Sequence, residues 1–243
     1  MKISIIHTSR DRPAIALQTC KKWMDSLNSD LDITYNFGVE QIDINDYMPV
    51  IDELKSIYND RFKVRTFTGR RIVLGDRIPT EDMLLAGGIL TANVKGNILA
   101  RESGADWLVC IADNLFPVSG WDELMKPYFE KSLNEIAILG YANQVWRKLI
   151  SHPILTKEFL KWNDDCIMYE GYYHTHGDCE LFIKSLKTGA LRLLPSTLNP
   201  THNHSYHGTA EEDRLCLLNN SKASYYQGGL VWEKRKNIDW KIV

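Results

Sequence analysis

ADWLVCIADN, residues 105–114, is a short and almost entirely apolar run that ends on a carboxylate and an amide. It follows a helix-like segment that ends at Gly104. Such a run is typical of a central parallel strand that is buried on both faces. In open α/β sheets, ligands bind beyond the carboxyl ends of these strands. Asp113 could therefore hold a hard divalent cation and, through it, phosphates, or it could simply cap a turn.

The N-terminal segment repeats this arrangement of a strand followed by polar residues. Residues 1–7 (MKISIIH) have a strand pattern, and a polar loop leads into a helix that begins near Pro13. A strand, a polar loop and a helix form the first unit of a nucleotide-binding α/β fold. The loop residues Thr8, Ser9 and Arg10 lie where a ligand would bind. A solvated loop without a ligand is the alternative interpretation.

Between these two strands, the pattern predicts further α/β elements. Residues 31–39 form a second strand, and residues 80–103 are predicted to form one helix that Gly104 closes. Asn93 and Asn97 are four residues apart and so share one face of that helix. The segment 61–77 is rich in arginine and lysine. A charged run of this kind is typical of a solvated face, and an edge that contacts phosphates is the alternative.

Composition excludes several classes of protein. The 243 residues are 44% hydrophobic and 25% charged, with a formal net charge of -2, which is ordinary for a soluble globular protein. The five cysteines form no CxxC pair, so reduced thiols are favoured over disulfides or a zinc knot. No apolar run approaches the roughly 20 residues that span a bilayer, and no signal region is visible. We expect a soluble, cytoplasmic protein without a clear domain boundary.

The second half is rich in aromatic residues and histidines, most of them between residues 143 and 208. Asp178 stands at the start of a predicted helix that Gly189 closes, where it could cap the helix or act as a general base exposed in a cleft. His202 and His204 alternate, so both point the same way in an extended backbone. Two such histidines are weak evidence for zinc, because no cysteine pair completes a structural site. A cation shared by Asp113 and one of these histidines explains both clusters together.

Four motifs then occur in a characteristic order. They are Ser9-Arg10-Asp11-Arg12-Pro13; Ala112-Asp113-Asn114 with Trp121-Asp122-Glu123; Gly177-Asp178-Cys179-Glu180-Leu181; and His202-Asn203-His204, followed by Glu211-Glu212-Asp213 and Gln227-Gly228. This order resembles family-2-type GT-A glycosyltransferases, and more closely a group of small phage and bacterial proteins of that type. The chain departs from their pattern at Asn114, where an acid is usual, and at Gly177, where a glutamate is usual.

The resemblance implies a single GT-A domain, with a mostly parallel central sheet flanked by helices. Residues 1–114 would form its half that binds the nucleotide sugar, and residues 115–243 its acceptor and catalytic half. It implies an inverting enzyme that uses Mn²⁺ or Mg²⁺ to move a sugar from a nucleotide donor, with a UDP-sugar as the first choice, to an acceptor hydroxyl. The acceptor would be a glycan or a hydroxymethylated pyrimidine in phage DNA. A non-catalytic binder of nucleotide sugars or carbohydrates is the alternative.

The resemblance also implies a role for individual residues. Asp178 would be the catalytic base, and Asp113 would hold the cation together with His204 or His202. The donor would be bound by Thr8, Ser9, Arg10, Glu40, Asp43, Asn93, Asn97, Asp113 and Asn114. The acceptor would be bound by Trp121, Asp122, Tyr173 and His176.

Overall fold

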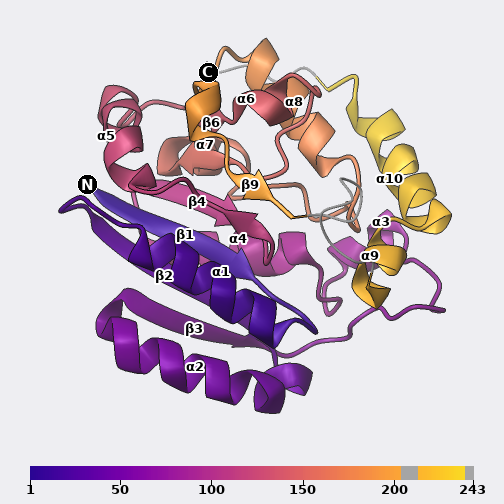
Figure 1. The fold of residues 1–243 in the computed structure, drawn as a ribbon. Helices are drawn as coiled ribbons and strands as arrows, with labels where there is room; N and C mark the ends of the chain where they lie inside the picture. The colour runs from indigo at the N-terminus through magenta and orange to yellow at the C-terminus, as the bar shows by residue number, and fades with distance from the viewer. Residues whose placement is uncertain (204–212, 239–243) are drawn as a thin grey trace.

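The computed structural model describes residues 1–203 and 213–238, which fold around one central sheet (Figure 1). The sheet has seven strands in the order β3-β2-β1-β4-β7-β6-β8, so the apolar run at residues 105–114 does supply the central strand, β4. The strands β3, β2, β1 and β4 are parallel, whereas β7 is antiparallel to both of its neighbours. The strands are β1 (Lys2–Thr8), β2 (Asp32–Glu40), β3 (Phe62–Phe67), β4 (Trp107–Ile111), β6 (Ile138–Gly140), β7 (Ile154–Thr156) and β8 (Leu191–Leu193).

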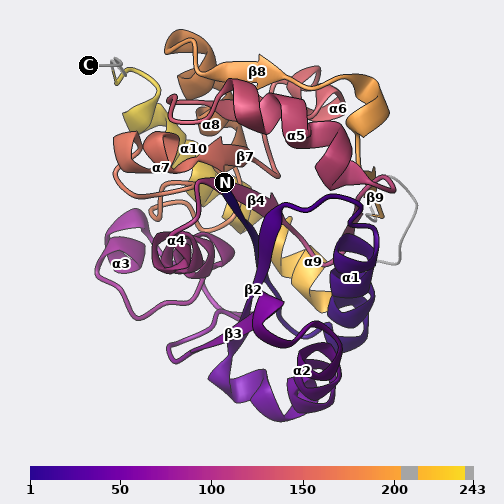
Figure 2. The same ribbon diagram turned by 90° about the vertical axis from the view of Figure 1, so that its left-hand side faces the viewer.

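Helices cover both faces of the sheet (Figure 2). They are α1 (Pro13–Asp25), α2 (Ile44–Tyr58), α3 (Glu81–Leu85), α4 (Ala92–Ser103), α5 (Trp121–Lys131), α6 (Ala142–Val145), α7 (Lys157–Trp162), α8 (Gly177–Lys187), α9 (Arg214–Asn219) and α10 (Lys222–Arg235). Side chains of successive β4 residues point to opposite faces. Trp107 packs in the core that α1, α2 and α5 cover, and Leu108 in the core that α4, α7 and α8 cover. The result is the layered α/β architecture predicted from the sequence.

The helix predicted over residues 80–103 is wrong in one respect, because the structure breaks it in two. Helix α3 ends at Leu85 and α4 begins at Ala92. Between them, Gly87 and Gly88 have φ angles of +81° and +80°, which lie in the left-handed region. The hydroxyl of Thr91 then accepts a hydrogen bond from the Val94 N–H and caps α4. Gly104, with φ +61°, ends α4 as predicted.

Local patterns also missed secondary structure at three other places. The basic segment 61–77 contains β3, which pairs with β2 along the edge of the sheet. Residues 222–235 form the long helix α10, which the sequence patterns did not predict. The short antiparallel strand β7 gave no recognisable signal. Glu211 and Glu212 of the fourth motif lie outside the described residues.

No helix within residues 1–203 and 213–238 is long and apolar enough to cross a membrane. None of the five cysteines, all of which lie in the described residues, forms a disulfide.

Candidate active site

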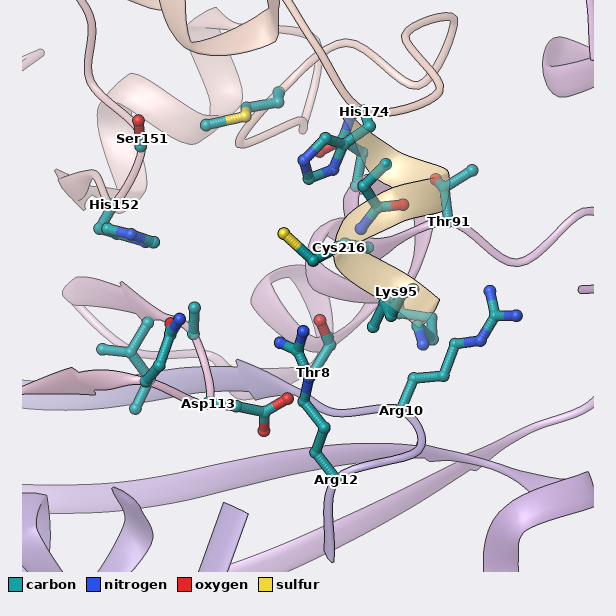
Figure 3. Close-up of a pocket in the computed structure, with 18 of the residues that line it drawn as sticks. Thr8, Arg10, Arg12, Thr91, Lys95, Asp113, Ser151, His152, His174 and Cys216 are labelled. Carbon is teal, nitrogen blue, oxygen red and sulfur yellow. The ribbon is translucent and has the colours of Figure 1, made fainter. Parts of the chain in front are cut away.

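The main cleft lies beyond the carboxyl ends of β1 and β4 and has a volume of about 360 Å³. Its walls come from the loop after β1, from α4, from the residues after β4, from the start of α8 and from α9. Figure 3 shows the side chains of Asp113, His152 and Cys216 turned toward a common space. A cleft at this edge of the sheet agrees with the general position of ligand sites in open α/β sheets.

A chain of hydrogen bonds between buried side chains holds Asp113 in place. It follows β4, is almost fully buried, and its Oδ1 lies 2.9 Å from Nε2 of His7. Nδ1 of His7 lies 2.6 Å from the hydroxyl of Tyr35. Burial, followed by the nearby Cys20 thiol and Asp113, raises the pKa of Tyr35 well above its usual value, so the phenol keeps its proton. We therefore assign the Nε2–H tautomer to His7, which accepts from Tyr35 and donates to Asp113.

A small second sheet brings His202 to the same place. Strand β5 (Leu115–Phe116) follows Asp113 directly and pairs with β9 (Thr201–His202), so that Leu115 lies opposite His202. Nδ2 of Asn114 donates to the carbonyl of Asn203 at 2.6 Å, which fastens this pairing. The structure thus brings His202 and Asp113 into one cleft, as the joint explanation of the two clusters required. His204 lies outside the described residues.

Asp178 also lines the cleft and lies in the first turn of α8. Its Oδ2 accepts a hydrogen bond from the Ser151 hydroxyl at 3.1 Å, and its Oδ1 accepts one from the Cys179 N–H at 2.9 Å. The dipole of the helix favours a negative charge at this position. The backbone carbonyl of Asp178 also accepts from the Ile150 N–H, so the loop that carries Ser151 is fixed to α8.

Positive side chains line the wall between β1 and α4. Arg10, Arg12 and Lys95 all face the cleft, and Nζ of Lys95 lies 2.7 Å from Oε1 of Glu40. Burial lowers the pKa of Lys95, although Glu40 works against this change. For Glu40, burial alone would raise the pKa, but Lys95 and Arg71 outweigh it and the pKa is lowered. Lys95 and Glu40 thus form a buried pair beside Arg10 and Arg12, and the basic side chains of this wall suit phosphates.

Glu40 and Asp43, which were expected to bind the nucleotide-sugar donor, are paired with basic side chains of the protein. Oε2 of Glu40 accepts from Nε of Arg71 at 2.9 Å, so both carboxylate oxygens of Glu40 have a partner. Asp43 also receives both Nη groups of Arg71, and it does not line the cleft. Asp43 therefore holds Arg71 in place, which is a correction to the expectation that it meets the nucleotide.

Other expected site residues have different positions. Thr8, Asn93 and Tyr173 line the cleft. Ser9 is buried, and its hydroxyl lies 2.6 Å from that of Tyr47. Asn97 is fully buried against the loop before α8, where its Oδ1 accepts from the Ile167 N–H at 2.8 Å. Ser9 and Asn97 therefore hold the loops around the cleft in place and do not line the cleft themselves.

The acceptor residues expected at α5 are wrong. Asp122 is fully buried and accepts hydrogen bonds from the N–H groups of Asn28 and Ser29, at 3.0 and 2.8 Å. Trp121 is also buried, and its Nε1 donates to the carbonyl of Trp23. Both residues fasten α5 to the end of α1, because a buried carboxylate needs local N–H donors. His176 lies at the α8–α10 contact, beside Tyr225, rather than in the cleft.

Sequence reasoning missed His7, Lys95 and Ser151 as site residues, and it did not place α9 at the cleft. His7 and Lys95 had a detectable signal, because each is a polar residue on the inner face of an otherwise apolar strand or helix. Helix α9 is tied over the cleft by Asp213, whose Oδ1 accepts from Nη2 of Arg12 at 2.7 Å. That tie joins residues far apart in sequence and had no local signal.

A divalent cation fits the donors that the structure brings together. Among residues 1–203 and 213–238 there is no cluster of three or more His, Cys, Asp or Glu that would enclose a metal by itself. Mg²⁺ and similar hard cations are commonly held by one or two carboxylates together with phosphates of the substrate. One oriented carboxylate at Asp113, with the imidazole of His202 in the same cleft, is compatible with that mode of binding.

Comparisons with known proteins agree with this fold. No protein-family model and no curated protein sequence matches the chain. Among solved structures, TarS 1-349 from S. aureus in complex with UDP matches with a TM-score of 0.60 at 8% identity, over 82% of this chain and 60% of that one. The mannosyltransferase PcManGT from Pyrobaculum calidifontis, with GDP-Man and Mn²⁺, gives 0.58 at 6% identity, over 98% and 76%.

A third similar structure is glucosyl-3-phosphoglycerate synthase from Mycobacterium tuberculosis with Mn²⁺, UDP and glucosyl-3-phosphoglycerate. It gives a TM-score of 0.56 at 12% identity, over 98% of this chain and 81% of that one. The chain spans about 60% of the length of the TarS fragment. At these identities, the similarity shows the fold alone. The protein has the α/β fold of GT-A glycosyltransferase structures.

Proposed function

We propose that this protein is a metal-assisted glycosyltransferase that moves a sugar from a nucleoside-diphosphate donor to an acceptor hydroxyl. One observation carries the proposal. In a fold of the GT-A type, a single cleft brings together Asp113 at the end of the central strand and Asp178 at the start of α8. Cationic side chains of Arg10 and Lys95 line the same cleft. A transferase of this type needs a place for the diphosphate and a base for the acceptor, and the two carboxylates supply them.

The reaction would be one displacement at the anomeric carbon. The acceptor oxygen forms a bond to that carbon while the bond to the diphosphate oxygen breaks on the opposite face, and the electron pair leaves with the diphosphate. Asp178 takes the proton of the acceptor hydroxyl. The hydrogen bond from Ser151 orients the carboxylate of Asp178 for this task. A single in-line displacement inverts the configuration of the sugar.

Asp113, with His202 or His204, would hold Mn²⁺ or Mg²⁺ in this cleft. When bound, the cation supplies Lewis-acid stabilisation of the charge on the diphosphate. Arg10 and Lys95 would bind the phosphates, and His7 would keep the Asp113 carboxylate oriented. Asn114 brings no second negative charge to the cation, because its side chain is a neutral amide whose Nδ2 donates to the carbonyl of Asn203. A single carboxylate favours weak cation binding, which makes a non-catalytic nucleotide-sugar binder the second candidate.

A glycan is the acceptor that we propose, with UDP as the first donor nucleotide to test. The alternative, a hydroxymethylated pyrimidine in DNA, would rely on the basic segment 61–77. In that segment Arg71 points inward to Glu40 and Asp43, and Nη2 of Arg65 lies 3.4 Å from Oε1 of Glu102. These ion pairs leave fewer positive charges for a DNA backbone, whose binding depends on phosphate contacts.

A thermal-shift panel of UDP, GDP, dTDP and CDP, each with and without Mn²⁺, tests the proposal. A ligand at about 100 times its dissociation constant stabilises the fold by about 2.7 kcal/mol, which the method detects. We expect one nucleotide to stabilise the protein with Mn²⁺, and the isosteric variant Asp113→Asn to lose this dependence on the metal. No response to any nucleotide would contradict the proposal.

Asp178→Asn separates the enzyme from the binder. We expect this variant to bind donor and metal as the wild type does, because Asp178 is assigned to the acceptor. Its rate of sugar transfer or donor hydrolysis should fall about 10²- to 10⁴-fold, the usual contribution of a general base. Equal rates in both proteins would show that Asp178 is not the base. Donor binding without turnover in the wild type would favour the non-catalytic binder.

A further inference from the structure

A second, smaller pocket opens beside the main cleft, and we call it the side chamber. It has a volume of about 100 Å³, and Ile6, Gly96, Pro153 and Ile167 contribute to its mainly apolar wall. Thr8, Ile111 and Asn93, among others, line both the chamber and the main cleft, so the two spaces adjoin. An apolar pocket next to a phosphate site does not suit the charged diphosphate itself. We therefore expect a less polar part of the substrate to bind there.

Helix α4 and the segment before α8 build this chamber together. Asn97 fastens the segment to the helix, because its Oδ1 accepts from the Ile167 N–H at 2.8 Å and its Nδ2 donates to the Met168 carbonyl at 2.9 Å. A Cβ added at Gly96 would meet only Cδ1 of Ile167, at 3.8 Å, among the described residues. Gly96 and Ile167 are therefore close neighbours in one apolar wall of the chamber, and a methyl group added at Gly96 would project from that wall.

Residues next to both carboxylates of the proposed reaction line the chamber. Ile111 ends the strand β4 that leads to Asp113, and Thr8 ends the neighbouring strand β1. Ser151, whose hydroxyl is bonded to Asp178, lines the same chamber. The sugar being transferred must extend from the diphosphate at Asp113 to the acceptor oxygen at Asp178. A substituent of that sugar is thus the group placed to enter the chamber.

We propose that the side chamber binds the N-acetyl group of an N-acetylated donor sugar, an inference that rests on the proposed function. An apolar cavity of about 150 Å³ binds benzene, so the smaller chamber suits a group of a few heavy atoms rather than one hydroxyl. The acetyl methyl would lie against the apolar wall that includes Gly96 and Ile167. Asn93 and Ser151 are polar residues of the chamber wall that suit the amide N–H and C=O.

Titration calorimetry with UDP, UDP-glucose and UDP-N-acetylglucosamine, each with Mn²⁺, tests this assignment. We expect the wild type to bind the N-acetylated donor about 10-fold or more tightly than UDP-glucose, the selectivity that one apolar group gives in a matching pocket. The variant Gly96→Ala fills part of the chamber and should lose most of that preference. Its affinity for UDP should stay close to that of the wild type, because UDP lacks the sugar.

Ile167→Val provides the opposite change, since it enlarges the chamber by one methyl group. This variant should keep the preference for an N-acetylated donor and improve binding of the larger N-propanoyl analogue. Equal wild-type affinity for both donors, with UDP bound, would overturn the inference and leave the proposed function intact. The inference would also fail if Gly96→Ala weakened the binding of both donors equally. Absence of binding of UDP and of both donors would overturn the proposed function itself.

Discussion

His7 lies at the carboxyl end of β1, between Tyr35 and Asp113, and is fully buried. Residues that orient a metal ligand in this way usually change metal affinity by about 10- to 100-fold when they are mutated. We therefore expect His7→Gln to weaken the Mn²⁺-dependent binding of UDP by such a factor. Binding of UDP without metal should change much less, because His7 does not line the cleft. Mn²⁺ titrations monitored by calorimetry measure both quantities.

Tyr35→Phe is the matched control at this scale. It removes the hydroxyl that bonds to Nδ1 of His7 but keeps the bond between His7 and Asp113. Its effect on the Mn²⁺-dependent affinity should be smaller than that of His7→Gln. If a folded His7→Gln protein bound Mn²⁺ and UDP as the wild type does, His7 would have only a structural role.

At the scale of elements, the glycines between α3 and α4 decide where the helix starts. Gly88 has φ +80°, where a side chain costs about 1–2 kcal/mol, and no heavy atom of the described residues lies within 4 Å of an added Cβ. Gly88→Ala should therefore destabilise the fold through its backbone alone. Gly96 lies inside α4, where Gly→Ala typically stabilises by about 0.4–1 kcal/mol.

The two substitutions are expected to change the free energy of unfolding in opposite directions, so each variant is a control for the other. Urea unfolding followed by circular dichroism should give a lower midpoint for Gly88→Ala and a higher one for Gly96→Ala, with the same slope. A Gly88→Ala protein as stable as the wild type would mean that α3 and α4 can join into one helix. The increase expected for Gly96→Ala also ensures that its altered donor binding does not come from misfolding.

At the scale of the whole molecule, the two halves share their core. One hydrophobic cluster contains Ile3 and Trp107 from the first half together with Leu139 and Leu198 from the second. We expect residues 1–114 and 115–243 to unfold in one transition rather than two. Near-ultraviolet signals of the seven tryptophans and far-ultraviolet signals of the backbone should then have the same midpoint. Two separate midpoints would show that the halves are independent domains.

Local patterns in the sequence were enough to predict the neighbouring strands β1, β2 and β4 of the sheet. The apolar run of β4, the strand β1 and the closing glycine Gly104 report short-range properties, namely the spacing of apolar residues and the φ angle at a helix end. The same patterns placed Asp113 and Asp178 at ends of elements, where side chains reach a cleft. They misjudged Trp121 and Asp122, because a side chain at a helix start faces solvent or core depending on what packs beside it.

The α/β class, the central strand and the two carboxylates on which the proposed function depends could therefore be predicted from the amino-acid sequence. The pairing of buried charged and polar groups, such as Lys95 with Glu40 and His7 with Asp113, became visible only in the folded structure. The physical reason is distance along the chain. Periodicity and capping involve neighbours within a few residues, whereas the partner of a buried charge is chosen by long-range packing, where an unpaired charge would be too costly.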